Sequence, residues 1–366
     1  MIAKRANKID SSGIRKVFDL AVNMNNPINL SIGQPDFDVP EPVKEAAINA
    51  IKNGFNSYTP TQGTEEFRDC VRAYLENKNR IKNHLSDSIM ITSGVSGGLF
   101  LAMMSLVNPG DEVIFSDPYF VMYKHHVNML GGVPVYVDTY PDFKLTAERI
   151  EPCISAKTKL LIVNSPSNPT GAVYSNEDVI EIADLCNEKN IFVLTDEIYS
   201  SFCYDDPFES IFPYVENGML LEGFSKSHGM TGWRVGYAVG PEELIQTMNK
   251  IQQYTFVCAP SIAQKAGITA LEHNMDEEIN AYRRKRDLIY NGLKDKFELE
   301  KPGGAFYAFV RAPDDNGASF VEKAIAKNLL IIPGSVFSER DSHFRISYAA
   351  DDQVIKRGID VLLSIM

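Results

Sequence analysis

The apolar residues of this chain form short runs that alternate with longer amphipathic segments. Runs bounded by turn residues, which are typical of buried strands, lie at 112–115, 133–137, 160–164 and 191–194. Segments with apolar residues at helical spacing lie at 120–130 and 176–188. This alternation predicts an α/β fold with a largely parallel sheet that helices cover on both faces. Ligands of such a sheet bind at the carboxyl ends of its strands.

Periodicity also predicts elements nearer the two ends of the chain. We expect helices at 14–24, 43–52, 65–76, 276–293 and 352–363, and strands around 306–311 and 344–348. The helix at 276–293 is long and charged, as expected for a helix that bridges two domains. We therefore expect residues 41–275 to form a large domain and 276–366 a smaller one. Residues 1–40 should contribute to the smaller domain and to the mouth of the active site.

Composition narrows the class of protein. A chain of 366 residues with 44% hydrophobic and 23% charged residues is ordinary for a soluble globular enzyme. The net charge of −12 argues against binding to nucleic acid or to anionic membranes. The five cysteines are scattered without a Cys-x-x-Cys pair, which indicates neither a disulfide framework nor a zinc site. The histidines lack metal-ligand spacing, and the N-terminus lacks an apolar signal sequence, so we expect a cytoplasmic protein without metal.

The most informative stretch is 219–240, where two apolar runs enclose Ser225, Lys226 and Arg234. Burial between strands would lower the pKa of a lysine, and Schiff-base chemistry needs the neutral amine. Arg234 follows eight residues later, so both side chains could turn toward one anionic group. A lysine that extends to solvent beside a structural arginine would give the same pattern.

The sequence Ser-Lys-x-x-x-Met-Thr-Gly-Trp-Arg-x-Gly-Tyr at 225–237 resembles the lysine signature of class I/II aminotransferases, which use pyridoxal 5′-phosphate (PLP). The resemblance implies PLP fold type I, with a seven-stranded, mostly parallel sheet and a smaller α+β domain. It implies that Lys226 carries PLP as an internal aldimine, while Ser225 and Arg234 hold the phosphate. Gly223 is a serine in many relatives, so one hydroxyl contact to the phosphate is expected to be missing.

Other strand ends supply partners for the same cofactor. A strand leads into Ser93-Gly94-Val95-Ser96 before an apolar helix. The unpaired N–H groups at the start of that helix, around Val95, and the hydroxyl of Ser96 would form an anion site, although many α/β turns look similar. Asp196 ends another strand, and its carboxylate would keep the pyridine nitrogen protonated, which makes the ring an electron sink. By resemblance, Tyr199 and Asn168 bind the phenolic oxygen. Taken singly, Asp196 could cap a helix and Asn168 could begin a turn.

Four further residues follow from the resemblance. Arg345 would grip the substrate α-carboxylate, because its planar guanidinium binds carboxylates bidentately; the alternative is a surface ion pair. Gly33 would lie near that carboxylate, or simply in a linker loop. Tyr119 would stack on the cofactor, or pack in the core. Tyr58 would reach the neighbouring subunit's phosphate in a homodimer, or pack locally.

The resemblance thus implies an aminotransferase that moves an amino group between an L-amino acid and a 2-oxo acid. Lys226 would take the α-proton and return it to the cofactor. A PLP-dependent lyase of the same fold, such as a carbon–sulfur lyase or an aminocyclopropane-carboxylate-synthase-like enzyme, would use the same residues. A PLP-binding regulator of DNA is disfavoured by the charge. The side-chain pocket should draw on 11–14, the Gly33 loop and residues near Tyr123, which offer no evident second arginine for a dicarboxylate.

Overall fold

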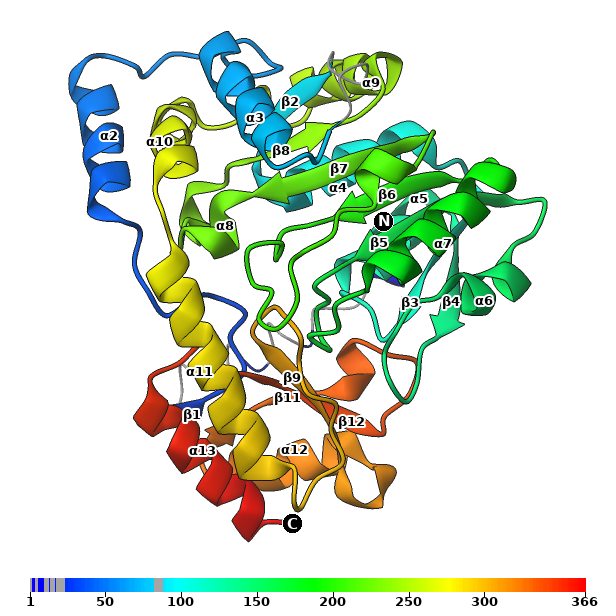
Figure 1. Ribbon diagram of the computed structural model, residues 1–366, viewed down its shortest axis with the longest axis vertical. Coiled ribbons are helices and arrows are strands. Elements are labelled where there is room, and N and C mark those ends of the chain that lie inside the picture. Colours follow the sequence, from blue (N-terminus) through cyan, green and yellow to red (C-terminus); the bar gives the residue numbers. More distant parts are fainter. Residues whose placement is uncertain (1, 4–5, 10–12, 14–16, 18–23, 82–87) are drawn as a thin grey trace.

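The centre of the protein is a seven-stranded sheet of order β2-β8-β7-β6-β5-β3-β4. The computed structural model describes all residues except 1, 4–5, 10–12, 14–16, 18–23 and 82–87 (Figure 1). The strands are β2 (Ile89–Thr92), β3 (Glu112–Asp117), β4 (Val133–Asp138), β5 (Thr158–Asn164), β6 (Phe192–Asp196), β7 (Gly218–Gly223) and β8 (Gly236–Val239). All neighbouring pairs are parallel except the two that β8 makes, with β2 and β7.

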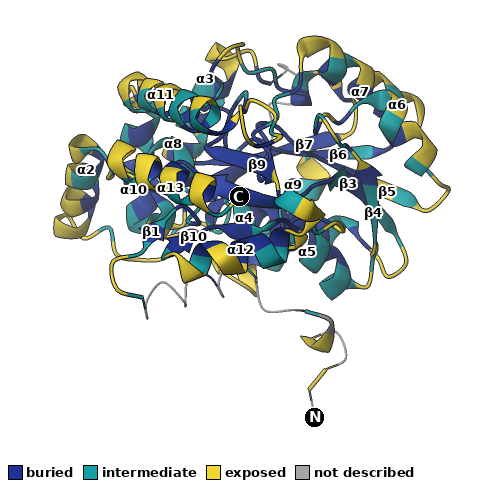
Figure 2. Cartoon of the chain, turned by 90° about the horizontal axis from the view of Figure 1, so that it is seen from below, coloured by how far each residue is buried: buried dark blue, intermediate teal, exposed yellow. Residues whose placement is uncertain are grey.

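Helices cover both faces of this sheet, because its strands are apolar on both sides. On one face the core includes residues of α4 (Gly94–Leu106), α5 (Met122–Leu130) and α9 (Glu242–Gln253). On the other it includes residues of α2 (Glu41–Lys52), α3 (Glu65–Asn77), α6 (Ala147–Ile150), α7 (Asn176–Glu188) and α10 (Ser261–Glu272). Figure 2 shows the buried strands inside a shell of helices with exposed outer sides.

A smaller sheet of order β11-β12-β9 is built from the C-terminal part of the chain. Its strands β9 (Tyr307–Arg311), β11 (Ile332–Pro333) and β12 (His343–Ser347) are antiparallel. A separate parallel pair joins β1 (Ile28–Asn29) to β10 (Leu329–Leu330). The helices here are α11 (Asp276–Leu293), α12 (Gly317–Ala326) and α13 (Asp352–Ser364), and α11 runs from the large sheet to the small one (Figure 1).

Short helical turns complete the described fold. The turn α8 (Phe224–Ser227) follows β7 directly and carries Lys226. The 3₁₀ turns are η1 (Ala6–Lys8), η2 (Glu151–Cys153), η3 (Phe212–Tyr214), η4 (Thr231–Trp233), η5 (Pro313–Asp315) and η6 (Gly334–Val336). The α/β fold and the largely parallel seven-stranded sheet are confirmed. The helix expected at 14–24 falls almost entirely outside the described residues.

Candidate active site

A cavity of about 260 Å³ opens at the carboxyl ends of the central strands and contains most of the predicted site residues. Its lining is Gly33, Val95, Ser96, Leu99, Phe120, Met122, Asn164, Asn168, Asp196, Ile198, Tyr199, Ser225, Lys226, Arg234, Tyr307 and Arg345. Of the predicted site residues, Tyr58 and Tyr119 are missing from this lining. Gly33 and Arg345, which are 312 residues apart (345 − 33), therefore line one cavity, as the fold places the strand ends together.

Lys226 projects into the cavity, and its Nζ donates a hydrogen bond to the Gly33 carbonyl at 2.6 Å. Burial lowers the pKa of Lys226 to about 8, and the nearby guanidinium groups of Arg345 and Arg234 contribute to this shift, while Asp196 opposes it. A larger share of the amine is therefore neutral near pH 7 than for an exposed lysine. This is the state that a nucleophilic or proton-accepting amine requires.

One end of the cavity is suited to a phosphate. Arg234 donates through Nη2 to Ser96 Oγ at 2.7 Å, beside the N-terminus of α4. Ser93 precedes that helix and makes no side-chain cap, so its first N–H groups are open to a ligand. Gly94 has a φ of 71°, and a Cβ there would lie 2.6 Å from Arg234 Nη2. Glycine at this position therefore lets the arginine cross the helix start.

Asp196 lies at the end of β6, deeper in the cavity. Its Oδ2 accepts a hydrogen bond from the Tyr123 hydroxyl at 2.8 Å, and its Oδ1 accepts one from the Ile198 N–H at 3.3 Å. Burial raises the pKa of Asp196 to about 6, although the hydrogen bond from Tyr123 opposes this shift. A cationic ring nitrogen placed against it would favour the ionised form. Sequence reasoning placed Tyr123 near the substrate side chain and missed its contact with Asp196.

The cavity also contains Arg345, which is only 1% exposed. Its Nη1 donates to Asn168 Oδ1 and its Nη2 to the Ser31 carbonyl, both at 2.9 Å. The guanidinium lies 4.4 Å from the ring centres of Tyr307 and Phe337, which fix its plane. Its buried Nε has no hydrogen-bond partner among the described residues. An unpaired donor on a buried guanidinium fits an arriving carboxylate.

Tyr199 and Asn168 also line the cavity. The Tyr199 hydroxyl is 2.8 Å from the Tyr307 hydroxyl, and the Asn168 N–H donates to Asn164 Oδ1 at 3.0 Å. Asn164 in turn donates to the Asp196 carbonyl at 2.9 Å. This chain of contacts fixes the middle of the cavity to the ends of β5 and β6.

The structure corrects the prediction that Tyr119 stacks on a cofactor. Tyr119 is 2% exposed and lies outside the cavity, where its hydroxyl donates to Glu339 at 2.7 Å and its ring stacks on Tyr136. Phe120, the next residue, lines the cavity instead. The reason is chemical: the polar tip of the tyrosine has a carboxylate partner, whereas the apolar phenylalanine ring faces the binding space.

Tyr58 is 84% exposed and lies beside a wider surface hollow of about 1130 Å³. Ser96 and Arg234 also line this hollow, so the phosphate end of the cavity borders on it. The exposed aromatic residue is therefore near the predicted phosphate site but outside the cavity.

Comparison with known proteins decides the family. Residues 25–362 match the family described as "Aminotransferase class I and II". The chain belongs to this family. It is 37% identical to a probable aspartate aminotransferase of Methanocaldococcus jannaschii over the full length of both chains. It is also 37% identical to a probable N-acetyl-LL-diaminopimelate aminotransferase of Bacillus subtilis, covering 99% of this chain and 95% of that protein.

Solved structures agree with this family assignment. The aspartate aminotransferase of Thermus thermophilus with maleate superposes with a TM-score of 0.95 at 32% identity, over 100% of both chains. The aspartate aminotransferase of Rhizobium meliloti gives 0.93 at 33% identity, covering 100% of this chain and 98% of that one. The fold is therefore PLP fold type I.

The protein is thus a PLP-dependent aminotransferase with amino acid and 2-oxo acid substrates, and the lyase alternative is not favoured. The cavity fits the cofactor, since it offers an amine, a carboxylate and an arginine beside a helix N-terminus. Among the described residues, every helix is too short or too polar to cross a lipid bilayer.

Proposed function

We propose that Lys226 binds PLP covalently, that Asp196 pairs with its pyridine nitrogen, and that Arg234, Ser225, Ser96 and the N–H of Val95 hold its phosphate. Tyr199 and Asn168 would bind the phenolic oxygen, and Phe120 would pack against the ring. The observation that carries this proposal is a buried lysine of lowered pKa in one cavity with Asp196 and two arginines.

Borohydride reduction of the PLP-loaded protein should fix the cofactor to Lys226. Reduction converts the bond between amine and aldehyde into a stable secondary amine, which peptide mass mapping locates. The chain has many other lysines, but their side chains lie outside the cavity among the described residues. A pyridoxyl group found mainly on another lysine would contradict the assignment.

The bound cofactor supplies an electron sink for the negative charge that develops on the substrate α-carbon. The chain's own residues do the rest. Arg345 holds the substrate carboxylate near Gly33, and Asn168 orients that guanidinium through its contact with Nη1. The Lys226 amine, once released, takes the α-proton as a base and returns it as an acid. With the cofactor bound, the Asp196 carboxylate would hold the proton on the ring nitrogen.

We further propose that the amino donors have neutral side chains. The three cations of the cavity have assigned partners: Lys226 the cofactor, Arg234 its phosphate and Arg345 the α-carboxylate. Among the described lining residues no cation remains for a second carboxylate, and an unpaired buried carboxylate is costly. This proposal separates the chain from relatives whose names specify aspartate.

A panel of amino donors tests this proposal. We expect kcat/KM for L-leucine, L-methionine or L-phenylalanine to exceed that for L-aspartate by at least about tenfold, which corresponds to roughly 1.4 kcal/mol. The half-reaction is read as the loss of absorbance of the PLP form under single-turnover conditions. A higher kcat/KM for L-aspartate would show that a cation outside the described lining reaches the substrate.

We also propose a homodimer in which Tyr58 reaches the partner's phosphate site. Tyr58 and Tyr254 are 84% and 88% exposed, and Phe256 is also exposed at the hollow that Arg234 lines. Tyr58 and Phe256 both line this hollow, and exposed aromatic residues at one hollow are typical of an interface. Sedimentation velocity tests the mass in solution, and a monomer at micromolar concentration would contradict it.

The division of the chain remains a proposal as well: a large domain at 41–275 and a smaller one at 276–366, to which residues 1–40 contribute. The separate cores around the seven-stranded and three-stranded sheets support it. We propose a cytoplasmic location because all five cysteines are free, as suits a reducing compartment.

A further inference from the structure

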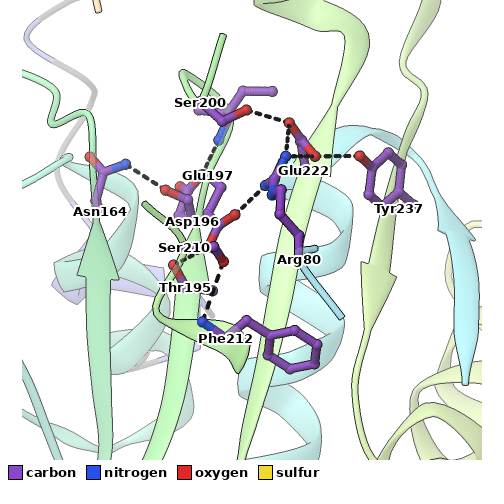
Figure 3. Close-up of polar contacts among 11 residues, drawn as sticks. Arg80, Asn164, Thr195, Asp196, Glu197, Ser200, Ser210, Phe212, Glu222 and Tyr237 are labelled. Carbon is purple, nitrogen blue, oxygen red and sulfur yellow. Dashed lines mark hydrogen bonds and ion pairs between the residues drawn. The ribbon is translucent and has the colours of Figure 1, made fainter. Parts of the chain in front are cut away.

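Three charged side chains, Arg80, Glu197 and Glu222, form a buried cluster behind the active site (Figure 3). Arg80 contacts Glu197 through Nη2, and its Nη1 lies 3.0 Å from Glu222 Oε2 and 3.1 Å from Oε1. One guanidinium therefore joins a residue that follows β6 to a residue of β7. Arg80 itself comes from the segment after α3, where its N–H donates to the Leu75 carbonyl at 2.9 Å.

Hydroxyl groups surround the two carboxylates. Glu197 Oε1 accepts hydrogen bonds from Thr195 at 3.0 Å and Ser210 at 2.6 Å. Glu222 accepts hydrogen bonds from Ser200 and from Tyr237 on β8. These hydroxyls stabilise the carboxylates but carry no charge themselves. The cluster therefore has several hydrogen bonds, but it contains two carboxylates and only one guanidinium.

The cluster lies on the opposite face of the sheet from the cavity. Successive side chains of a strand point to opposite faces, so Asp196 faces α5 while Glu197 faces the other side. The same alternation places Glu222 beside Tyr237, whose ring belongs to the core of that other face. Glu197 follows Asp196 directly, and Glu222 precedes Lys226 by four residues. The cluster thus adjoins the two strand ends that carry the assigned acid and amine.

The cluster contains one more carboxylate than guanidinium. Burial lowers the pKa of Arg80, but Glu222 and Glu197 outweigh burial and place it well above the usual value, so Arg80 is a cation. Burial raises the pKa of Glu197, and Arg80 opposes this shift. Both carboxylates contact the same guanidinium, so the cluster carries one net negative charge whenever both are ionised.

We propose that the net negative charge of the Arg80–Glu197–Glu222 cluster raises the proton affinity of the active-site groups at the ends of β6 and β7. The inference rests on the roles proposed for Asp196 and Lys226. Glu197 and Glu222 act through these residues, so they are positioning residues and not catalytic ones. The sign is the same for every group in reach, because a nearby negative charge always raises proton affinity.

The other charged and titratable groups that face Asp196 and Lys226 belong to the residues of the active site. Asp196 is faced by the hydroxyl of Tyr123 on α5, by Tyr199 and by Lys226 on α8. Lys226 is faced by Arg345 on β12 and by Arg234 after η4. A substitution within the cluster replaces none of these groups.

The test is a pH titration of the visible absorbance of the PLP-loaded enzyme, which reports the proton at the cofactor–lysine bond. Glu222→Gln keeps the size of the side chain and makes the cluster neutral. A unit charge within roughly 10 Å at an effective dielectric constant near 20 shifts a titration by about one unit. We therefore expect the midpoint to fall by about half a unit or more.

Two matched variants separate charge from structure. Arg80→Lys keeps the charge but cannot bridge both carboxylates in the same way, so the midpoint should not move. Glu66→Gln removes one carboxylate from the exposed ion pair with Lys265 and should also have no effect on the midpoint. Thermal unfolding shows whether each variant is folded. If Glu222→Gln does not fold, Glu197→Gln gives the same charge change and the same expected fall.

A fall for the glutamine variants without a shift for Arg80→Lys would support the proposal. An unchanged midpoint in the glutamine variants, or an equal shift in Arg80→Lys, would overturn it and leave a purely structural cluster. If the wild-type protein forms no absorbing complex with PLP, the proposed roles of Lys226 and Asp196 fail, and this inference fails with them.

Discussion

Replacing Lys226 by alanine is expected to lower kcat by about 10⁴-fold or more, the largest effect of any single substitution in the chain. On the roles proposed for Lys226, the variant loses both the amine for the cofactor and the base for the α-proton. Because burial and two arginines lower the pKa of this amine to about 8, it is matched to proton transfer near neutral pH. No other amine lines the cavity among the described residues, so the loss has no local substitute.

The measurement is single-turnover transfer from a good donor, with PLP in excess. Added methylamine should restore part of the rate, since a small amine can enter the space left by the side chain and carry the proton. Lys265→Ala, which removes an exposed lysine from an ion pair with Glu66, is the matched control and should keep the wild-type rate. A Lys226→Ala protein that retains kcat within a factor of about ten would refute both roles of the lysine.

Much of the fold was predictable because the decisive patterns are local. The helices expected at 176–188 and 276–293 have these same bounds in the structure, as α7 and α11. Ser175 caps α7 and exchanges hydrogen bonds with Asp178, which explains why a sequence pattern could locate that boundary. The direction of β8 was less accessible, since an apolar run has the same composition in a parallel or an antiparallel strand.

The candidate site also contains some residues that local motifs predict and others that they do not. Lys226, Asp196, Arg234 and Arg345 lie in short motifs, and the structure brings all four into one cavity. The motif could not show whether Tyr119 or Phe120 faces the cavity, because the two aromatic residues are adjacent in the sequence. The outcome depends on Glu339, which is 220 residues from Tyr119 in sequence.

Partners that meet only through the fold left no signal in the sequence. Arg80 and Glu222 are 142 residues apart, and in the sequence each is indistinguishable from an ordinary surface charge. Tyr123 and Asp196 are 73 residues apart, so their hydrogen bond was likewise hidden. Sequence patterns therefore miss the residues that contact and position the reacting groups, because these contacts depend on packing in the folded protein and not on spacing in the sequence.

Asp196→Asn is expected to keep the fold and to lower kcat by about 10²-fold or more, the second large effect. Asparagine has nearly the same shape, and its carbonyl oxygen can still accept the hydrogen bond from Tyr123, so the melting temperature should stay close to that of the wild type. A neutral amide, however, cannot hold a proton on the ring nitrogen, and the electron sink weakens by about 1.4 kcal/mol for each unit of pKa lost.

Burial raises the pKa of the Asp196 carboxyl to about 6, so this carboxyl is mostly ionised at pH 7 even before a cation arrives. Asp117→Asn is the matched control, because Asp117 is also buried at a strand end and has a pKa raised by burial, yet lies outside the cavity. Its kcat should remain near that of the wild type. Melting temperature and kcat are measured on both variants. Replacing a carboxylate that stabilises the fold lowers the melting temperature, whereas replacing one that acts on the cofactor lowers kcat alone. An Asp196→Asn protein with an unchanged kcat would leave the ring nitrogen without an assigned partner.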